Sequence, residues 1–202
     1  MKVGVFGGSF NPVHHAHLAV AEAARKTFSL DRVLFVPAAV PPHKRREKLA
    51  SDRDRLAMLR LALEGREAFE ADDLELRRGG VSYTVDTIEE LRRRFPPGTE
   101  FFFILGSDSL PILPQWKEVH QLLAAVRFAV YPRKGFASSI LDGLAGRFSE
   151  EEIQSLRSGF LDLPPVDISA TEVRERLRRG EAVDHLVPRP VAEYLRTHGL
   201  VL

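Results

Sequence analysis

The chain of 202 residues carries 29 basic and 28 acidic side chains, a formal net charge of +1, and 44% of its residues are hydrophobic. This composition predicts one globular domain over 1–202, with two small domains left open, and its near-neutral charge demands neither nucleic acid nor a membrane as partner. The absence of cysteine from the sequence excludes a disulfide framework, a cysteine-ligated metal and a thiol nucleophile.

The first predicted elements are a strand, a glycine pair and a helix. An apolar run over 2–6 ends in Gly7-Gly8, and a helical pattern covers 18–28. We expect the helix to begin near Asn11-Pro12, a suitable N-cap and first-turn pair. Glycines let the backbone approach an anion, and the first N–H groups of a helix point at it. The segment therefore predicts a phosphate site, although it has neither the third glycine of GxGxxG nor the GxxxxGK[ST] pattern.

Three histidines stand at this predicted helix start. His14 and His17 are three residues apart and would share one helix face, whereas His15 would point elsewhere. No carboxylate or cysteine is close to them in the sequence, so the pair suits neutralising a transferring phosphate better than binding a metal. The alternative is a set of partly exposed histidines with no chemical role.

Apolar runs and helical patterns then alternate along the chain. We expect further strands over 32–37, 69–77, 100–105, 127–131 and 159–163. We expect helices that open at Ser51 and Thr84 as N-caps, and helical segments over 137–148, 149–156 and 190–198. The alternation predicts an α/β fold with a doubly wound, mostly parallel sheet and helices on both faces.

Four further residues are candidates for a functional site in this pattern. Asp108 directly follows the most apolar strand, and open parallel sheets bind ligands beyond the carboxyl ends of their strands. Trp116, the only tryptophan, has polar and proline neighbours, which indicates the rim of a site rather than a core. In the loop over 38–50, two prolines stiffen the chain before His43 and Lys44 and restrict the directions of both basic side chains.

The last informative segment opens another helix. Ser169 and Glu172 have the spacing of a capping box, which explains both residues structurally. Thr171 and Arg174 fall in the first turns of the same helix. A capped helix start with a hydroxyl and an arginine also predicts a phosphate cradle.

The segment GGSFNPVHHAH, residues 7–17, resembles the GGxFxPxHxGH motif of the nucleotidyltransferase superfamily with a HIGH-type motif. Within it, the chain is most similar to the bacterial nicotinate-mononucleotide adenylyltransferases. Five more matches follow in the family's order: PPHK at 41–44, SYTVDT at 82–87, GSD at 106–108, Trp116, and ISATEVR at 168–174. Ala16 replaces the family's glycine, and Ala170 replaces one of its hydroxyl residues.

The resemblance implies a Rossmann-like nucleotidyltransferase that converts ATP and nicotinate mononucleotide into deamido-NAD and pyrophosphate, with Mg²⁺ on the triphosphate. No activated nucleophile is visible, so direct attack on the α-phosphate is expected. The implied catalytic residues are His14, His17, Lys44 and Arg174. The implied ATP-binding residues are Gly7, Gly8, Ser9, Phe10, Gly106, Arg133, Ile168, Ser169 and Thr171. The implied acceptor-binding residues are Thr84, Asp108 and Trp116, with the indole stacked on the pyridine ring and the backbone N–H groups of Thr84 and Trp116 at its carboxylate.

Two alternatives stay open at this point. A sister transferase for nicotinamide mononucleotide or phosphopantetheine would share the histidines and differ in the acceptor pocket. A non-catalytic nucleotide-binding regulator would be expected to carry an extra domain or to lack a motif histidine. A tRNA-synthetase fragment is disfavoured by the length and by the lack of a KMSKS-like segment. Because no apolar run approaches 18 residues and no leader pattern opens the chain, we expect a cytoplasmic protein, and a homo-oligomer is left open.

Overall fold

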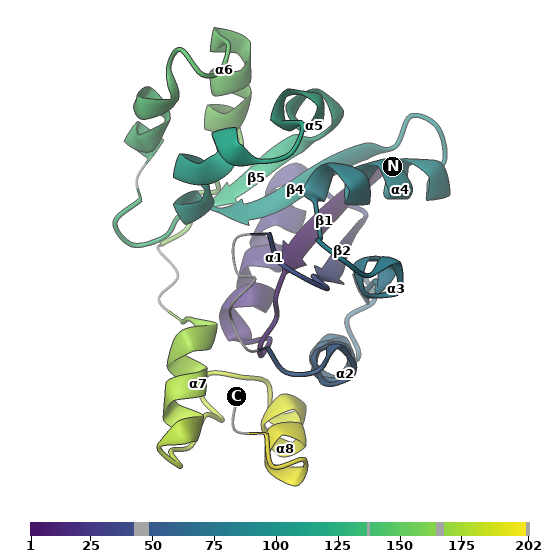
Figure 1. Cartoon of the computed structure of the whole chain (residues 1–202), viewed down its shortest axis with the longest axis vertical. Coiled ribbons are helices and arrows are strands. Elements are labelled where there is room, and N and C mark those ends of the chain that lie inside the picture. The colour runs from purple at the N-terminus through teal and green to yellow at the C-terminus, as the bar shows by residue number, and fades with distance from the viewer. Residues whose placement is uncertain (43–48, 137, 165–167, 201–202) are drawn as a thin grey trace.

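The computed structural model describes residues 1–42, 49–136, 138–164 and 168–200. Five strands form one parallel sheet in the order β3-β2-β1-β4-β5, with helices on both of its faces (Figure 1). The strands are β1 (Lys2–Gly8), β2 (Arg32–Pro37), β3 (Phe69–Ala71), β4 (Glu100–Gly106) and β5 (Arg127–Tyr131). The predicted doubly wound α/β fold is confirmed, and its strand order reverses between β1 and β4.

Eight α-helices within the described residues surround the sheet. They are α1 (His15–Phe28), α2 (Asp52–Leu63), α3 (Leu74–Arg78), α4 (Thr84–Arg94), α5 (Val119–Ala125), α6 (Glu150–Ser158), α7 (Ala170–Arg178) and α8 (Arg189–Thr197). Two 3₁₀ segments, Ser107–Gln115 and Ser138–Leu144, connect them. None of the helices in this part of the chain is both long and apolar enough to cross a membrane.

Two apolar cores lie on the two faces of the sheet. Along β4, Phe102 and Ile104 join the core beneath α1, α2 and α8, whereas Phe101 and Phe103 join the core beneath α4 and α5. A strand that is buried on both faces reads as a continuous apolar run, which is why β2, β4 and β5 were predictable from the sequence.

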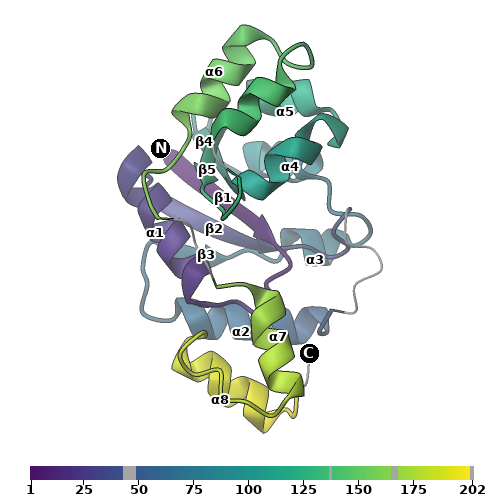
Figure 2. The same cartoon turned by 90° about the vertical axis from the view of Figure 1, so that its left-hand side faces the viewer.

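Helices α7 and α8 lie together at one end of the molecule, beyond the carboxyl ends of the central strands (Figure 2). The Tyr194 hydroxyl of α8 donates to the Asp54 carboxylate of α2 at 2.9 Å. Ser51 caps α2 as predicted, because its hydroxyl accepts the Asp54 backbone N–H at 3.1 Å. Helix α8 is therefore held against α2, and α7 lies beside it at the end of the sheet where ligands bind in open α/β folds.

The predicted strand over 69–77 is wrong beyond Ala71. The buried Asp72 carboxylate accepts the Leu74 backbone N–H at 3.0 Å, which starts the short helix α3. The same carboxylate pairs with Arg94 of α4 at 2.8 Å. An ion pair with a distant helix thus turns the chain out of the sheet.

Two other predicted elements differ in the structure. The expected strand over 159–163 is a single bridge to the edge of β5, in which Gly159 and Leu161 each bond to the backbone of Val130 at 2.8 Å. The expected helical segment over 137–148 contains only the 3₁₀ turns of Ser138–Leu144, and residue 137 lies outside the described residues. The segment over 149–156 forms α6, with the Ser149 hydroxyl as its N-cap.

Candidate active site

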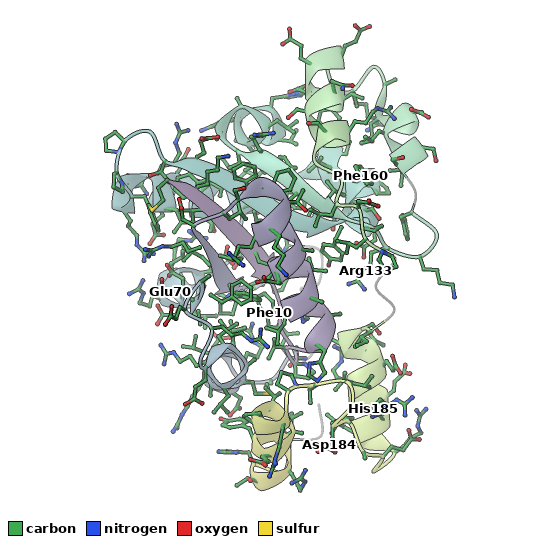
Figure 3. The ribbon with its side chains drawn as sticks, turned by 180° about the vertical axis from the view of Figure 1, so that it is seen from behind. Phe10, Glu70, Arg133, Phe160, Asp184 and His185 are labelled. Carbon is green, nitrogen blue, oxygen red and sulfur yellow. The ribbon has the colours of Figure 1, made fainter. Side chains whose placement is uncertain are left out.

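A cleft of about 490 Å³ opens where the ends of β1, β4 and β5 face the N-termini of α1 and α7. We call it the histidine cleft. Its lining includes these sequence-predicted site residues: Ser9, Phe10, His14, His17, Asp108, Arg133, Ser169, Thr171 and Arg174. Figure 3 shows Arg133 between the sheet and α7. Tertiary structure thus gathers residues from both ends of the chain around one space.

A second cleft of about 300 Å³ adjoins the first and extends toward α3 and α4. We call it the tryptophan cleft. Its sequence-predicted lining residues are Gly7, Gly8, Thr84, Gly106 and Trp116. It shares Ser9, His17, Asp108 and Arg133 with the histidine cleft, so these four residues mark the junction of the two spaces.

One described residue of the predicted site, Ile168, is not brought to the clefts. Ile168 packs, partly buried, against the core beneath α1 and is absent from both linings. Lys44 lies outside the described residues. At Gly106, by contrast, a Cβ atom would overlap the Asp108 carboxylate, so glycine is what allows that side chain to fold back over the end of β4.

The predicted start of α1 near Asn11-Pro12 is wrong, because the helix begins at His15 with His14 as its N-cap. The preceding loop contains Phe10 at a φ of 45° and a cis Asn11–Pro12 peptide bond. The His14 backbone N–H donates to Nδ1 of His17 at 3.1 Å, so an imidazole supplies the cap that we expected from asparagine.

The two predicted histidines stack on each other, with ring centroids 3.6 Å apart and an interplanar angle of 25°. The side chain of His15 is exposed and is absent from the linings of both clefts, as predicted. Burial is the largest cause that lowers the pKa of His14, and the nearby charges of Arg133 and His15 lower it further, to about 3. Burial is also the largest cause at His17, and the charges of His14 and Arg133 add to it, so the pKa of His17 lies well below its ordinary value. Both rings are therefore neutral near pH 7.

The cap fixes the tautomer of His17. Because Nδ1 accepts the His14 backbone N–H, the proton of the neutral ring must sit on Nε2. His17 lines both clefts, so Nε2–H is its remaining donor for a ligand. His14 keeps a buried Nδ1 atom with no hydrogen-bond partner among the described residues.

Two arginines supply positive charge to the histidine cleft. Arg174 donates to the Asn11 carbonyl at 3.0 Å and to the Thr171 hydroxyl at 3.1 Å, and so joins α7 to the loop before α1. Nε of Arg133 is buried 3.9 Å from the Asp108 carboxylate, too far for a hydrogen bond, and has no hydrogen-bond partner among the described residues. Asp108 is the only carboxylate in the described lining of this cleft.

Ser169 is the N-cap of α7 as predicted, but the reciprocal half of the predicted capping box is missing, because the Glu172 carboxylate bonds to Arg176. The Ser169 hydroxyl accepts the Glu172 backbone N–H at 3.1 Å, and the Glu172 carboxylate contacts Arg176 Nε at 3.2 Å. The positive end of the α7 dipole therefore faces the histidine cleft, which is the orientation an anion requires.

The tryptophan cleft is bounded by the start of α4. Tyr83 is the N-cap residue and Thr84 the first helical residue, so the predicted N-cap role of Thr84 is wrong. Trp116 is half-buried at the rim, edge-on to Phe103 with ring centroids 5.9 Å apart. Its backbone N–H donates to the Leu113 carbonyl at 3.0 Å, whereas its buried indole Nε1 has no partner among the described residues.

Sequence reasoning missed Arg55, whose side chain is fully buried in α2. It donates to the Ser9 carbonyl at 2.9 Å and pairs with Asp52, so it anchors the loop that follows β1. A signal was available, because Arg55 stands three and four residues before the buried Met58 and Leu59, on the apolar face of the helix. An arginine on a helix stripe that is otherwise apolar needs buried acceptors.

Among the described residues, no group of three His, Cys, Asp or Glu side chains lies close enough together to hold a metal ion. The arrangement instead combines helix N-termini, arginines and neutral imidazoles at the switch point of a parallel sheet. These donors suit a polyphosphate.

This fold and this site define a nucleotidyltransferase of the Rossmann-like type, and the cytidylyltransferase-like family model matches residues 5–176. A probable nicotinate-nucleotide adenylyltransferase of Salinibacter ruber is 44% identical over 200 residues, covering 99% of this chain and 97% of that protein. One from Dehalococcoides mccartyi is 38% identical over 202 residues, with the same two coverages. The chain belongs to the nicotinate-nucleotide adenylyltransferase family.

A solved structure agrees with the fold. The Plasmodium falciparum nicotinic acid mononucleotide adenylyltransferase, complexed with NaAD, superposes with a TM-score of 0.77 at 18% identity and covers 99% of this chain and 97% of its own. At that identity the likeness concerns the fold alone.

Proposed function

We propose that this chain transfers the adenylyl group of ATP to nicotinate mononucleotide, giving deamido-NAD and pyrophosphate in NAD biosynthesis. The observation that carries the proposal is the His14–His17 pair, of which His17 stands at the junction of two adjoining clefts. One cleft is rich in cationic and helix N-terminal donors, and the other offers an indole and the start of α4. Two clefts that meet at one junction suit two substrates that exchange a group there.

The triphosphate of ATP is assigned to the histidine cleft. Arg133 and Arg174 would neutralise its charge, and the N-termini of α1 and α7, with Ser169 and Thr171, would add donors. Lys44, outside the described residues, is proposed to join them. Mg²⁺ would enter as part of the MgATP substrate, because the described part of the lining offers one carboxylate and a polyphosphate supplies the other oxygen ligands.

The reaction needs positioning and charge stabilisation rather than a protein nucleophile. A phosphate oxygen of the mononucleotide forms a bond to the α-phosphorus of ATP, the bond from that phosphorus to the bridging oxygen breaks, and pyrophosphate leaves with its electron pair. Nε2–H of the neutral His17 would donate to an oxygen of the phosphate in transfer, beside His14.

The nicotinate end is assigned to the tryptophan cleft, with the pyridine ring against Trp116. The backbone N–H of Thr84, in the first turn of α4, and the helix dipole favour a carboxylate there. Because the Trp116 backbone N–H is bonded to Leu113, its unpartnered indole N–H is the better remaining donor from this residue.

The decisive experiment is pyrophosphate release with MgATP and a panel of acceptors, together with mass-spectrometric detection of the product. We expect nicotinate mononucleotide to be used with the highest kcat/KM. Preference for nicotinamide mononucleotide or phosphopantetheine would overturn the acceptor assignment alone. ATP binding without turnover of any acceptor would instead favour a nucleotide-binding regulator.

We further propose that residues 1–202 act as a single nucleotidyltransferase domain in the cytoplasm, without nucleic acid or membrane as a partner. The shared sheet between the two cores supports the single domain, and the net charge of +1 supports the absence of a nucleic-acid or membrane partner. A homo-oligomer is compatible with the proposal, and light scattering of the purified protein tests it.

A further inference from the structure

Glu75 is a buried carboxyl group in the lining of the tryptophan cleft. It belongs to α3, is only 6% exposed, and faces the same space as Thr84 and Trp116. The sequence pattern placed it in a strand and assigned it no function. A buried carboxylate is costly unless donors surround it, so its neighbours are informative.

Two hydroxyl groups stabilise the charged form of this carboxyl. The Thr87 hydroxyl donates to Oε1 of Glu75. The Ser82 hydroxyl lines the same cleft and lies close enough to the carboxyl to lower its pKa. Burial raises the pKa of Glu75, while both hydroxyls and Arg78, with Nη2 at 4.0 Å, act in the opposite direction.

Each hydroxyl already accepts a hydrogen bond from another donor. The Ala39 backbone N–H donates to Ser82 Oγ at 2.9 Å, and Arg78 Nη2 donates to Thr87 Oγ1 at 2.9 Å. The proton of each hydroxyl can therefore point at Glu75, and for Thr87 the carboxylate is a nearer acceptor than the Tyr83 carbonyl at 3.3 Å. The carboxylate can accept both protons at once because each of its oxygens has lone pairs available.

These bonds join three segments around the tryptophan cleft. Ser82 links Glu75 to the loop after β2, where the Ser82 backbone N–H also donates to the Val40 carbonyl at 3.0 Å. Thr87 links Glu75 to the first turn of α4, since its hydroxyl also contacts the Tyr83 carbonyl at 3.3 Å. Thr84 lies between the two anchored residues.

We propose that Glu75 is a positioning residue for the mononucleotide acceptor, which holds Ser82 and Thr87 so that the start of α4 and the loop after β2 form one side of the acceptor pocket. The inference rests on the proposed function, since it concerns the substrate assigned to this cleft. It assigns Glu75 no contact with the reacting atoms.

The test is Glu75→Gln, which keeps the size of the side chain but has one acceptor oxygen in place of two. One of the two hydroxyls loses its acceptor, so we expect the KM for nicotinate mononucleotide to rise about tenfold or more. The KM for ATP should stay within about twofold, because no residue of the histidine cleft bonds to Glu75. Glu90→Gln is the matched control. Glu90 contacts Nη1 of the same Arg78 at 3.2 Å and lines neither cleft, so its variant should keep both KM values.

A second variant tests the inference independently, in case Glu75→Gln does not fold. Ser82→Ala removes one of the anchored hydroxyls and should raise the same KM, and the double variant should be no worse than the more damaged single variant. Three results would overturn the inference: unchanged KM for the mononucleotide in Glu75→Gln, an equal rise in both KM values, or independent effects that multiply in the double variant. If Glu75→Gln fails to fold, an unchanged KM in Ser82→Ala overturns it.

Failure of the proposed function has a different signature. In that case the wild-type protein would release no pyrophosphate with nicotinate mononucleotide, and both proposals fall. An active wild type with an unaffected Glu75→Gln variant would overturn only the role of Glu75.

Discussion

Replacing His17 with asparagine or with glutamine should separate the work of its two ring nitrogens. Nδ1 accepts the His14 backbone N–H at 3.1 Å, whereas Nε2–H is left for the substrate. The amide of asparagine reaches about as far as Nδ1, and the amide of glutamine reaches about as far as Nε2. Each variant therefore preserves one function of the imidazole and removes the other.

The magnitudes differ enough to be told apart. Loss of a helix-capping bond costs about 1 kcal/mol, which is roughly 2–4 °C in Tm for a chain of this size. Loss of one donor to a transferring phosphate costs about 10²- to 10³-fold in kcat. His17→Asn should thus keep its Tm and lose kcat, while His17→Gln should lose a few degrees and retain more kcat than His17→Asn.

The assay is pyrophosphate release at saturating MgATP and nicotinate mononucleotide, alongside thermal unfolding of each variant. His15→Ala is the control, because that side chain is exposed and outside both clefts, and it should stay near wild type. Full kcat in His17→Asn would refute the assignment of Nε2 as the donor. Equal sensitivity of all three histidines would refute the paired role.

Three more predictions follow from the site. The pKa of His14 is about 3 in the folded protein and about 6.5 in the unfolded chain. Between pH 6.5 and 3 only the unfolded chain binds this proton, so the free energy of unfolding falls by up to about 1.4 kcal/mol for each unit by which the pH is lowered. His14→Asn should flatten that slope in urea unfolding at pH 7.5 and 5, and an unchanged slope would contradict the burial of a neutral ring. Arg174→Ala should raise the KM for ATP about tenfold or more at a stability cost of about 1 kcal/mol from the lost bond to Asn11. The exposed Arg178→Ala should change neither quantity, and equal effects of both would indicate a general charge effect. Trp116→Ala should raise the KM for nicotinate mononucleotide and leave the KM for ATP nearly unchanged. A rise in the KM for ATP alone would mean that the indole contacts ATP and not the mononucleotide.

The sequence alone determined the elements whose cause is local. Residues 32–37, 100–105 and 127–131 are strands because continuous apolar runs suit burial on both faces of a parallel sheet. Ser51 and Ser169 cap helices because each hydroxyl bonds to a backbone N–H three residues away. The motif order along the chain identified the family, and the described members of the predicted site, Ile168 excepted, do line the two clefts.

Tertiary structure decided the features whose cause lies far along the chain. The strand β3 stops at Ala71 because Asp72 pairs with Arg94, 22 residues on. Arg55 is buried because the Ser9 carbonyl, 46 positions away, accepts its hydrogen bond, and Arg174 reaches the Asn11 carbonyl across 163 positions. Local sequence patterns do not predict such partners, because a buried polar side chain is stabilised by groups that only the folded chain brings next to it. The tautomer of His17 and the surroundings of Glu75 are fixed in the same way, by contacts that exist only once the chain has folded.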